Sequence, residues 1–141
     1  MKLHEYQAKQ LFAAAGIPIP RGVVANTPAE AQAAYDTLRR QSTAKANETW
    51  ACSVKAQLHA GGRGKAGGIL VAHSAEVAAA HAASLLGRRL ITAQTGSEGL
   101  PVSAVLLEER IAVSQELYLA LTIDRFQARP VMLASRMGGV E

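Results

Sequence analysis

The strongest constraint on this chain is a glycine-rich, basic segment, residues 61–68, that lies between two β-prone runs. With its flanks it reads VKAQLHAGGRGKAGGILV over residues 54–71, and it holds five glycines and three cations. Glycine lets a backbone approach an anion closely and lets successive N–H groups converge on it. Lys and Arg add the positive charge that phosphate attracts. The pattern predicts a strand, a loop and a second strand, with the loop suited to a polyphosphate.

Two better-known phosphate motifs do not fit the segment. Gly62, Gly64 and Gly67 match G-x-G-x-x-G, but the dinucleotide fingerprint requires a helix directly afterwards, and residues 69–72 are apolar and β-prone. The P-loop motif requires Ser or Thr after its lysine, where this chain has Ala66. Strand, glycine loop and strand are mechanically similar to the loop that covers ATP in protein kinases. An ordinary surface hairpin stays open as the alternative.

Charge and composition favour an anionic partner without identifying it. The 141 residues carry a net charge of +4, with a pI near 9.6, and 49% of them are hydrophobic. A basic module that binds nucleic acid is the alternative class, but two Phe, one Trp and three Tyr offer few stacking platforms, and the cations form no single run. No apolar stretch approaches the ~18 residues of a membrane helix. The N-terminus is unlike a signal or transit peptide, so we expect a cytoplasmic protein.

Hydrophobic periodicity predicts a mixed α and β fold. Amphipathic helices are expected over residues 3–15, from Pro28 with a Thr27 cap, and after a Ser74 cap up to Gly87. In the first helix, Glu5 is placed to pair with Lys9 one turn later. Strands are expected at residues 23–25, 50–57, 69–73, 90–92, 104–107, 117–123 and 131–135.

The strand that begins at Trp50 alternates, with Cys52 and Val54 on the core face and Lys55 on the other. A lysine at such a position is usually solvated, but its place before the glycine loop favours a ligand role. Cys52 is the only cysteine, so there is neither a disulfide framework nor a cysteine metal cluster. No histidine has metal-ligand spacing or a catalytic setting, and we expect His59, near the loop, to make a structural hydrogen bond.

Two features concern the C-terminal part of the chain. Residues 108–113 break the apolar run before them, which suggests a crossing between lobes. The last two predicted strands have apolar faces, and no helix follows in the sequence to cover them. An uncovered sheet exposes apolar area and open edges, so we expect a fragment of a longer protein.

Over nearly all of its length the chain resembles the N-terminal part of the β subunits of succinate–CoA ligases (succinyl-CoA synthetases), which are ATP-grasp proteins. The most specific blocks are LHEYQAKQLF at residues 3–12 and the segment 54–68. Further matches are LGRRL at residues 86–90, QTG at 94–96, ELYL at 116–119, AS at 134–135 and GGVE at 138–141. Residues 41–49 look like a longer surface loop than the family usually has.

The resemblance implies an α+β ATP-grasp fold made of a small nucleotide-binding lobe and an incomplete second lobe. The small lobe would span residues 21–111. The larger lobe would include the N-terminal helix within residues 1–20 and would continue from residue 112 to the truncated end at 141. ATP or ADP would lie between the two lobes.

The resemblance also implies a set of nucleotide contacts. Lys55 would contact a phosphate, and residues 62–64 would close over the phosphate chain through their backbone N–H groups. Glu108 would lie at the hinge beside adenine, and Glu116 near the ribose. Ile111 takes a hinge position where relatives can carry Thr, so any hydroxyl used there is missing. The full set is Lys55, Gly62, Arg63, Gly64, Glu108, Ile111 and Glu116.

The family reaction joins succinate and CoA at the expense of a nucleoside triphosphate, through a phosphohistidine on a partner α subunit. The resemblance therefore implies a heteromer, and it places the Mg²⁺ ligands beyond Glu141 and the CoA and succinate sites outside this chain. Residues 1–141 would hold no catalytic residue and no metal ligand, and would be inactive alone. No nucleic-acid or membrane partner is expected. A related dicarboxylate–CoA ligase acting on malate is the alternative within enzymes, and a non-catalytic nucleic-acid-binding module is the alternative outside them.

Overall fold

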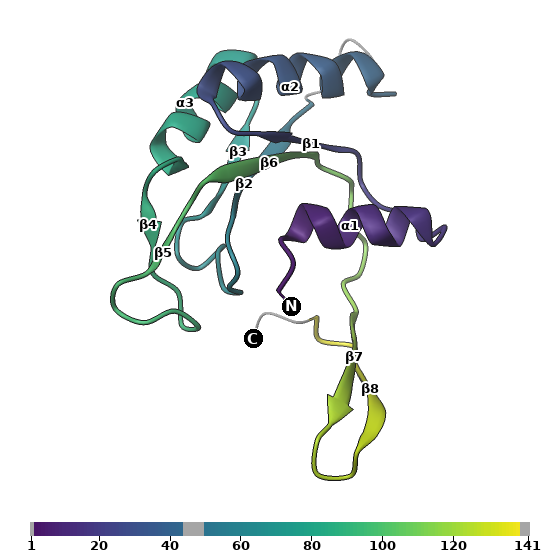
Figure 1. The fold of residues 1–141 in the computed structure, drawn as a ribbon. Helices are drawn as coiled ribbons and strands as arrows, with labels where there is room; N and C mark the ends of the chain where they lie inside the picture. Colours follow the sequence, from purple (N-terminus) through teal and green to yellow (C-terminus); the bar gives the residue numbers. More distant parts are fainter. Residues whose placement is uncertain (1, 44–49, 139–141) are drawn as a thin grey trace. The chain divides into compact units, whose positions relative to one another are not determined.

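The computed structural model describes residues 2–43 and 50–138, and the expected loop at residues 41–49 lies mostly outside the described residues. The chain divides into two compact units, Met1–Arg110 and Ile111–Glu141. Figure 1 shows the path of the chain through both. Within the described residues, no helix is long and apolar enough to cross a membrane.

The first unit is built on a four-stranded antiparallel sheet in the order β1-β6-β2-β3. Its strands are β1 (Gly22–Ala25), β2 (Cys52–Gln57), β3 (Ile69–Ala72) and β6 (Ala104–Glu109). Helices α2 (Pro28–Gln41) and α3 (Ala75–Leu85) cover one face, and α1 (Glu5–Ala14) lies on the opposite side (Figure 1). The short strands β4 (Arg89–Leu90) and β5 (Leu100–Pro101) form a separate pair. The sequence predicted the β4 region but not β5, which has only two residues.

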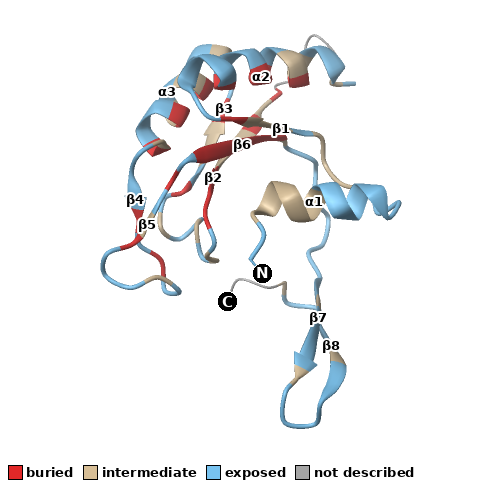
Figure 2. Ribbon diagram, viewed as in Figure 1, coloured by how far each residue is buried: buried red, intermediate tan, exposed pale blue. Residues whose placement is uncertain are grey.

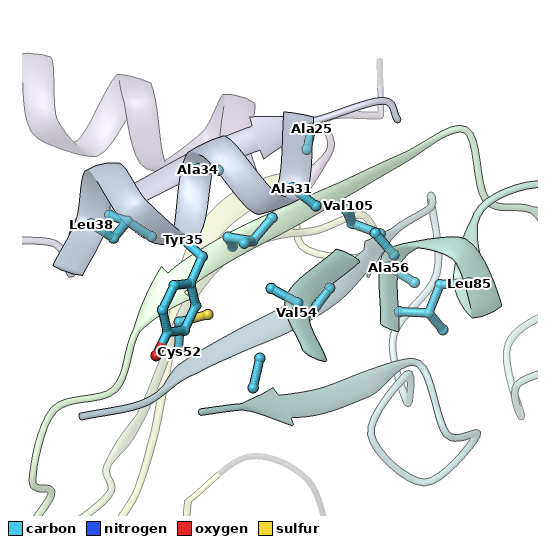
Figure 3. Packing of buried hydrophobic residues seen from close by; sticks show 14 of the residues in the cluster. Ala25, Ala31, Ala34, Tyr35, Leu38, Cys52, Val54, Ala56, Leu85 and Val105 are labelled. Atoms are coloured by element: carbon cyan, nitrogen blue, oxygen red, sulfur yellow. The ribbon is translucent and has the colours of Figure 1, made fainter. Parts of the chain in front are cut away.

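The core lies between the sheet and the helices α2 and α3, as Figure 2 shows by burial. Alternation along β2 and β6 directs Val54 and Leu107 into this layer, where both are fully buried. Figure 3 shows Val54, Leu38 of α2 and Leu85 of α3 among the packed side chains. Burial of this apolar surface is the main favourable term in the folding of the unit, and it fixes which strand residues face the other side.

The predicted helix caps are confirmed. The Thr27 hydroxyl accepts a hydrogen bond from the Glu30 N–H at 3.1 Å, and the Ser74 hydroxyl accepts one from the Val77 N–H at 3.2 Å. Each bond satisfies one of the N–H groups that the first turn of a helix leaves without a partner.

Two features of the first unit differ from expectation. The strand expected to end at Leu107 continues to Glu109, because Glu108 pairs in register with Gly22 and Ser53 on either side. The predicted break in the apolar run at Glu108 is therefore not the end of the strand. Helix α1 forms as predicted but has no buried residue, and its apolar side chains Leu11 and Phe12 are exposed.

The second unit is a β-hairpin of β7 (Tyr118–Asp124) and β8 (Arg129–Ser135), paired from Tyr118 with Ser135 to Asp124 with Arg129. Both strands were predicted. Asp124 organises the turn, since its Oδ1 accepts from the N–H groups of Phe126 at 2.9 Å and Gln127 at 3.1 Å. The apolar residues Leu119, Leu121 and Ile123 are exposed, so the hairpin has no core of its own.

Candidate nucleotide-binding site

Four charged residues form a closed ring on the sheet face away from the core. Lys55 Nζ lies 2.5 Å from Glu108 Oε1 and 3.2 Å from Glu5 Oε1. Lys9 Nζ lies 3.3 Å from Glu5 Oε1 and also binds Glu108 Oε2. Each cation thus contacts both carboxylates. We call Glu5, Lys9, Lys55 and Glu108 the charge ring.

Local geometry explains why these four residues meet. Glu5 and Lys9 are one helical turn apart on α1, as predicted. Lys55 of β2 is opposite Leu106 of β6, so Glu108 is its diagonal neighbour on the same face. Glu108 is 5% exposed, and a carboxylate so deeply buried requires cationic partners. The ring therefore joins α1 to the sheet at a point where α1 contributes no buried apolar residue.

Arg63 of the glycine loop is attached to the same ring. Its Nη2 donates to Glu5 Oε2 at 2.7 Å, and its Nη1 donates to the Ala56 carbonyl at 2.8 Å. Burial raises the pKa of the Glu5 carboxyl, but the charges of Lys55, Arg63 and Lys9, with the hydrogen bond from Arg63, outweigh burial and lower this pKa to about 2. Glu5 therefore stays ionised throughout the neutral range.

The glycine loop connects β2 to β3 as predicted, and it contains one tight helical turn. The Gly68 N–H donates to the Arg63 carbonyl at 2.7 Å, and the Gly67 N–H donates to the Gly64 carbonyl at 3.1 Å. This pair of bonds, with Gly67 at φ +72°, is the pattern that closes a helix C-terminus. The Ala66 N–H is engaged by the Gly62 carbonyl at 3.2 Å.

The backbone N–H groups at the other end of this turn are open. Within the described part of the chain, residues 62–65 show no hydrogen bond from their backbone N–H groups. The Gly61 N–H, just before them, donates to Gln94 Oε1 at 2.7 Å. Successive N–H groups left free at the start of a turn form a concavity that binds anions.

Close packing fixes the base of the loop. A Cβ on Gly68 would lie 2.6 Å from Leu90 Cδ2 and 3.2 Å from the Arg63 carbonyl oxygen. A Cβ on Gly61 would lie 3.0 Å from Gln94 Nε2. We expected a structural hydrogen bond for His59. The structure instead shows its ring stacked on that of His4, with ring centroids 4.0 Å apart.

A hollow of about 340 Å³ adjoins the charge ring between α1 and the sheet. Val24 of β1 and Leu106 of β6 supply apolar wall, and Tyr6, Lys9 and Glu108 border it. A second hollow of about 450 Å³ lies beside the loop, with Lys2, His59, Arg63 and Gln94 among its lining residues. The first combines apolar wall with charge, a setting that suits a flat aromatic ring joined to a charged group.

The structure brings most of the predicted site residues together. Lys55 and Glu108 are members of the charge ring in the first unit, Arg63 contacts the ring through Glu5, and Gly62 and Gly64 flank Arg63 in the loop. Ile111 and Glu116 belong to the second unit, where Ile111 is exposed. Sequence analysis did not assign Glu5, Lys9 or Gln94 to the site. The only signal for the first two was their spacing on α1, and it gave no sign of their contacts with the sheet.

The described residues contain no ready-made cluster for a metal ion. No group of three or more His, Cys, Asp or Glu side chains able to hold one occurs among them. The acids at the site, Glu5 and Glu108, are both engaged by cations.

Comparison with known proteins agrees with this fold. Residues 2–141 match the ATP-grasp domain, and the chain belongs to the ATP-grasp family. This membership gives the alternative of a nucleic-acid-binding module no support.

Within that family, the resemblance to succinate–CoA ligase β subunits is confirmed. The chain is 49% identical over 141 residues to the β subunit of ADP-forming succinate–CoA ligase from Wolinella succinogenes, 48% identical to that from Halorhodospira halophila and 45% identical to that from Geobacter sulfurreducens. Each match covers the whole of this chain and 34% of the relative, so the chain spans about a third of their length.

Proposed function

We propose that this chain is the nucleotide-binding part of the β subunit of an ADP-forming succinate–CoA ligase. The observation that supports this most directly is that Lys55 and Arg63 of the glycine loop contact the same carboxylate, Glu5, while the loop N–H groups at residues 62–65 are open. The relatives named above, 45–49% identical, are β subunits of that enzyme.

Lys55 is suited to a phosphate. Two carboxylates engage its ammonium group, and the three N–H donors of lysine leave one for a ligand. Three cations and two acids meet here, counting Arg63 with the charge ring, so the cluster carries a net charge of +1. A residual positive charge beside open N–H groups attracts a di- or triphosphate.

The remaining roles extend the proposal along the nucleotide. Residues 62–64 bind the phosphate chain through backbone N–H groups, since the Arg63 side chain is turned toward Glu5 and Ala56. The hollow beside Val24 and Leu106 has room and apolar wall for the base, with Glu108 at its border. The assignments of Ile111 to the hinge and of Glu116 to the ribose stay predictions, as does the division into a small lobe, residues 21–111, and a larger lobe formed by residues 1–20 and 112–141.

Transfer of a phosphoryl group requires mainly positioning and neutralisation of charge. In our proposal these residues bind and orient ATP or ADP. Mg²⁺ ligands, the succinate and CoA sites and the phosphorylated histidine of an α-subunit partner come from outside the described residues. The reaction takes place in the cytoplasm. Assays of the complete enzyme with succinate and malate test which dicarboxylate it takes.

Calorimetric titration of ADP into the complete protein tests the proposed site. Lys55→Met should weaken ADP binding by about tenfold or more, since a charge-assisted hydrogen bond contributes about 1.5–3 kcal/mol. Lys65→Met is the matched control, because it removes the same charge from an exposed position in the same loop. Equal losses in the two variants would mean that only the overall charge matters. No loss in Lys55→Met would contradict the proposed site.

A further inference from the structure

We propose that Glu5 is a positioning residue for the nucleotide site. It holds Lys55 and the glycine loop in a fixed geometry relative to each other. The inference rests on the proposed function and adds to it a residue of α1 that no sequence motif assigned. Glu5 would not contact the nucleotide itself. It would act through Lys55 and Arg63.

The two carboxylate oxygens of Glu5 contact different elements. Oε1 lies 3.2 Å from Lys55 Nζ of β2 and 3.3 Å from Lys9 Nζ of its own helix. Oε2 lies 2.7 Å from Arg63 Nη2 of the loop. The side chains of Glu5, Lys55 and Arg63 are only 17–19% exposed, so water screens these contacts weakly. One carboxylate thus links a helix, a strand and the glycine loop.

The Arg63 side chain serves to anchor the loop. Its guanidinium is held from one side by Glu5 and from the other by the Ala56 carbonyl. The backbone of Arg63 starts the tight turn that ends at Gly68, so the direction of the open N–H groups at residues 62–65 depends on where Arg63 is held. Gln94 fixes only the preceding residue, Gly61. Loss of Glu5 removes the contact that anchors the glycine loop nearest to Lys55.

Because Glu5 is negatively charged, its replacement can show by the direction of the change in ADP affinity whether it acts through charge or through positioning. The cluster of three cations and two acids has a net charge of +1. Replacing Glu5 by Gln removes one negative charge and raises this net charge to +2. Attraction alone then predicts tighter binding of an anionic nucleotide. Positioning predicts weaker binding, because the donors lose their fixed geometry and must be ordered when the ligand binds.

The experiment is calorimetric titration of ADP and of adenosine into the complete protein and its variants. Glu5→Gln should weaken ADP binding about tenfold more than it weakens adenosine binding, since adenosine has no phosphate for the loop. Glu5→Asp keeps the charge but shortens the side chain, and it should also weaken ADP binding. Asp36→Asn is the control for charge, because it removes one acid from the exposed side of α2, on the opposite face of the sheet.

Combination with Arg63→Met shows whether Glu5 acts through Arg63. Once Arg63 is replaced, Glu5→Gln should cost much less ADP affinity than it does alone. Unchanged or tighter ADP binding by Glu5→Gln, or an equal loss for adenosine, overturns the inference. The proposed function fails separately, when the parent protein binds no ADP or when Lys55→Met binds it as well as the parent does.

Discussion

Protonation of Glu5 should release α1 from the sheet in acid. Helix α1 has no buried residue, and the contacts that the charge ring and Arg63 provide hold its first turn to the sheet. Burial alone raises the pKa of Glu5, but the neighbouring cations bring it down to about 2, from an ordinary value of 4.5. When α1 is released, Glu5 regains its ordinary pKa. The Glu5 carboxylate therefore binds a proton less readily when α1 is docked than when it is released.

The magnitude follows from the difference between these two pKa values. A tenfold change in proton affinity corresponds to about 1.4 kcal/mol, so Glu5 contributes about 3 kcal/mol to docking of α1 at neutral pH. The full contribution is present above about pH 4.5, where Glu5 is ionised in both states. It falls as the pH drops toward 2, because the released helix binds the proton first. Glu109 also has a lowered pKa, chiefly through its hydrogen bond with Arg21, so acid also weakens this separate contact between β6 and the residue before β1.

Amide hydrogen exchange of α1 in the complete protein measures this effect, after correction for the intrinsic exchange rate at each pH. The opening free energy of the α1 amides should fall by about 3 kcal/mol between pH 5 and pH 2. In Glu5→Gln the α1 amides should open easily at every pH, and the part of the pH dependence due to Glu5 should vanish. An α1 helix equally protected at pH 5 and pH 2, or a Glu5→Gln variant with the pH dependence of the parent, would refute the reasoning.

Three further predictions concern the first unit. Gly68→Ala should destabilise the protein by about 1–3 kcal/mol and lower its melting temperature, because the new Cβ would overlap Leu90. Gly96→Ala is the control and should leave the melting temperature unchanged, because no atom lies near the position of its Cβ. Thr27→Ala should cost about 1 kcal/mol in denaturant unfolding through loss of the α2 cap, and a value near zero would contradict the role of the Glu30 N–H contact. Burial raises the pKa of the Cys52 thiol to about 11, so a thiol reagent at pH 8 should label it only after unfolding; rapid labelling of the native protein would show that it is accessible.

Features with a local cause were predictable from the sequence. The caps at Thr27 and Ser74 follow from short-range hydrogen bonds, and the hairpin that carries the glycine loop follows from glycine content between two β-prone runs. The placement of Lys55 on the face away from the core follows from the two-residue period of a strand. Each of these depends on residues close together in the chain.

Features that depend on distant pairing were not predictable. Glu108 looked like the end of a strand because it is charged, but neighbours on both sides extend β6 through it, and Lys9 and Lys55 satisfy its carboxylate. The spacing of Glu5 and Lys9 indicated only a pair on one helix face. Glu5 contacts Lys55 and Arg63, and Lys9 contacts Glu108; these partners are fifty or more positions away in the chain, and no local pattern carries that information.

A structure of the complete protein with bound ADP tests the central claim most directly. The account predicts phosphate oxygens within hydrogen-bond distance, about 2.7–3.2 Å, of Lys55 Nζ and of the backbone nitrogens of residues 62–64. It also predicts that the Arg63 side chain stays on Glu5. A nucleotide bound at another place, with the glycine loop and Lys55 free of phosphate, would contradict it.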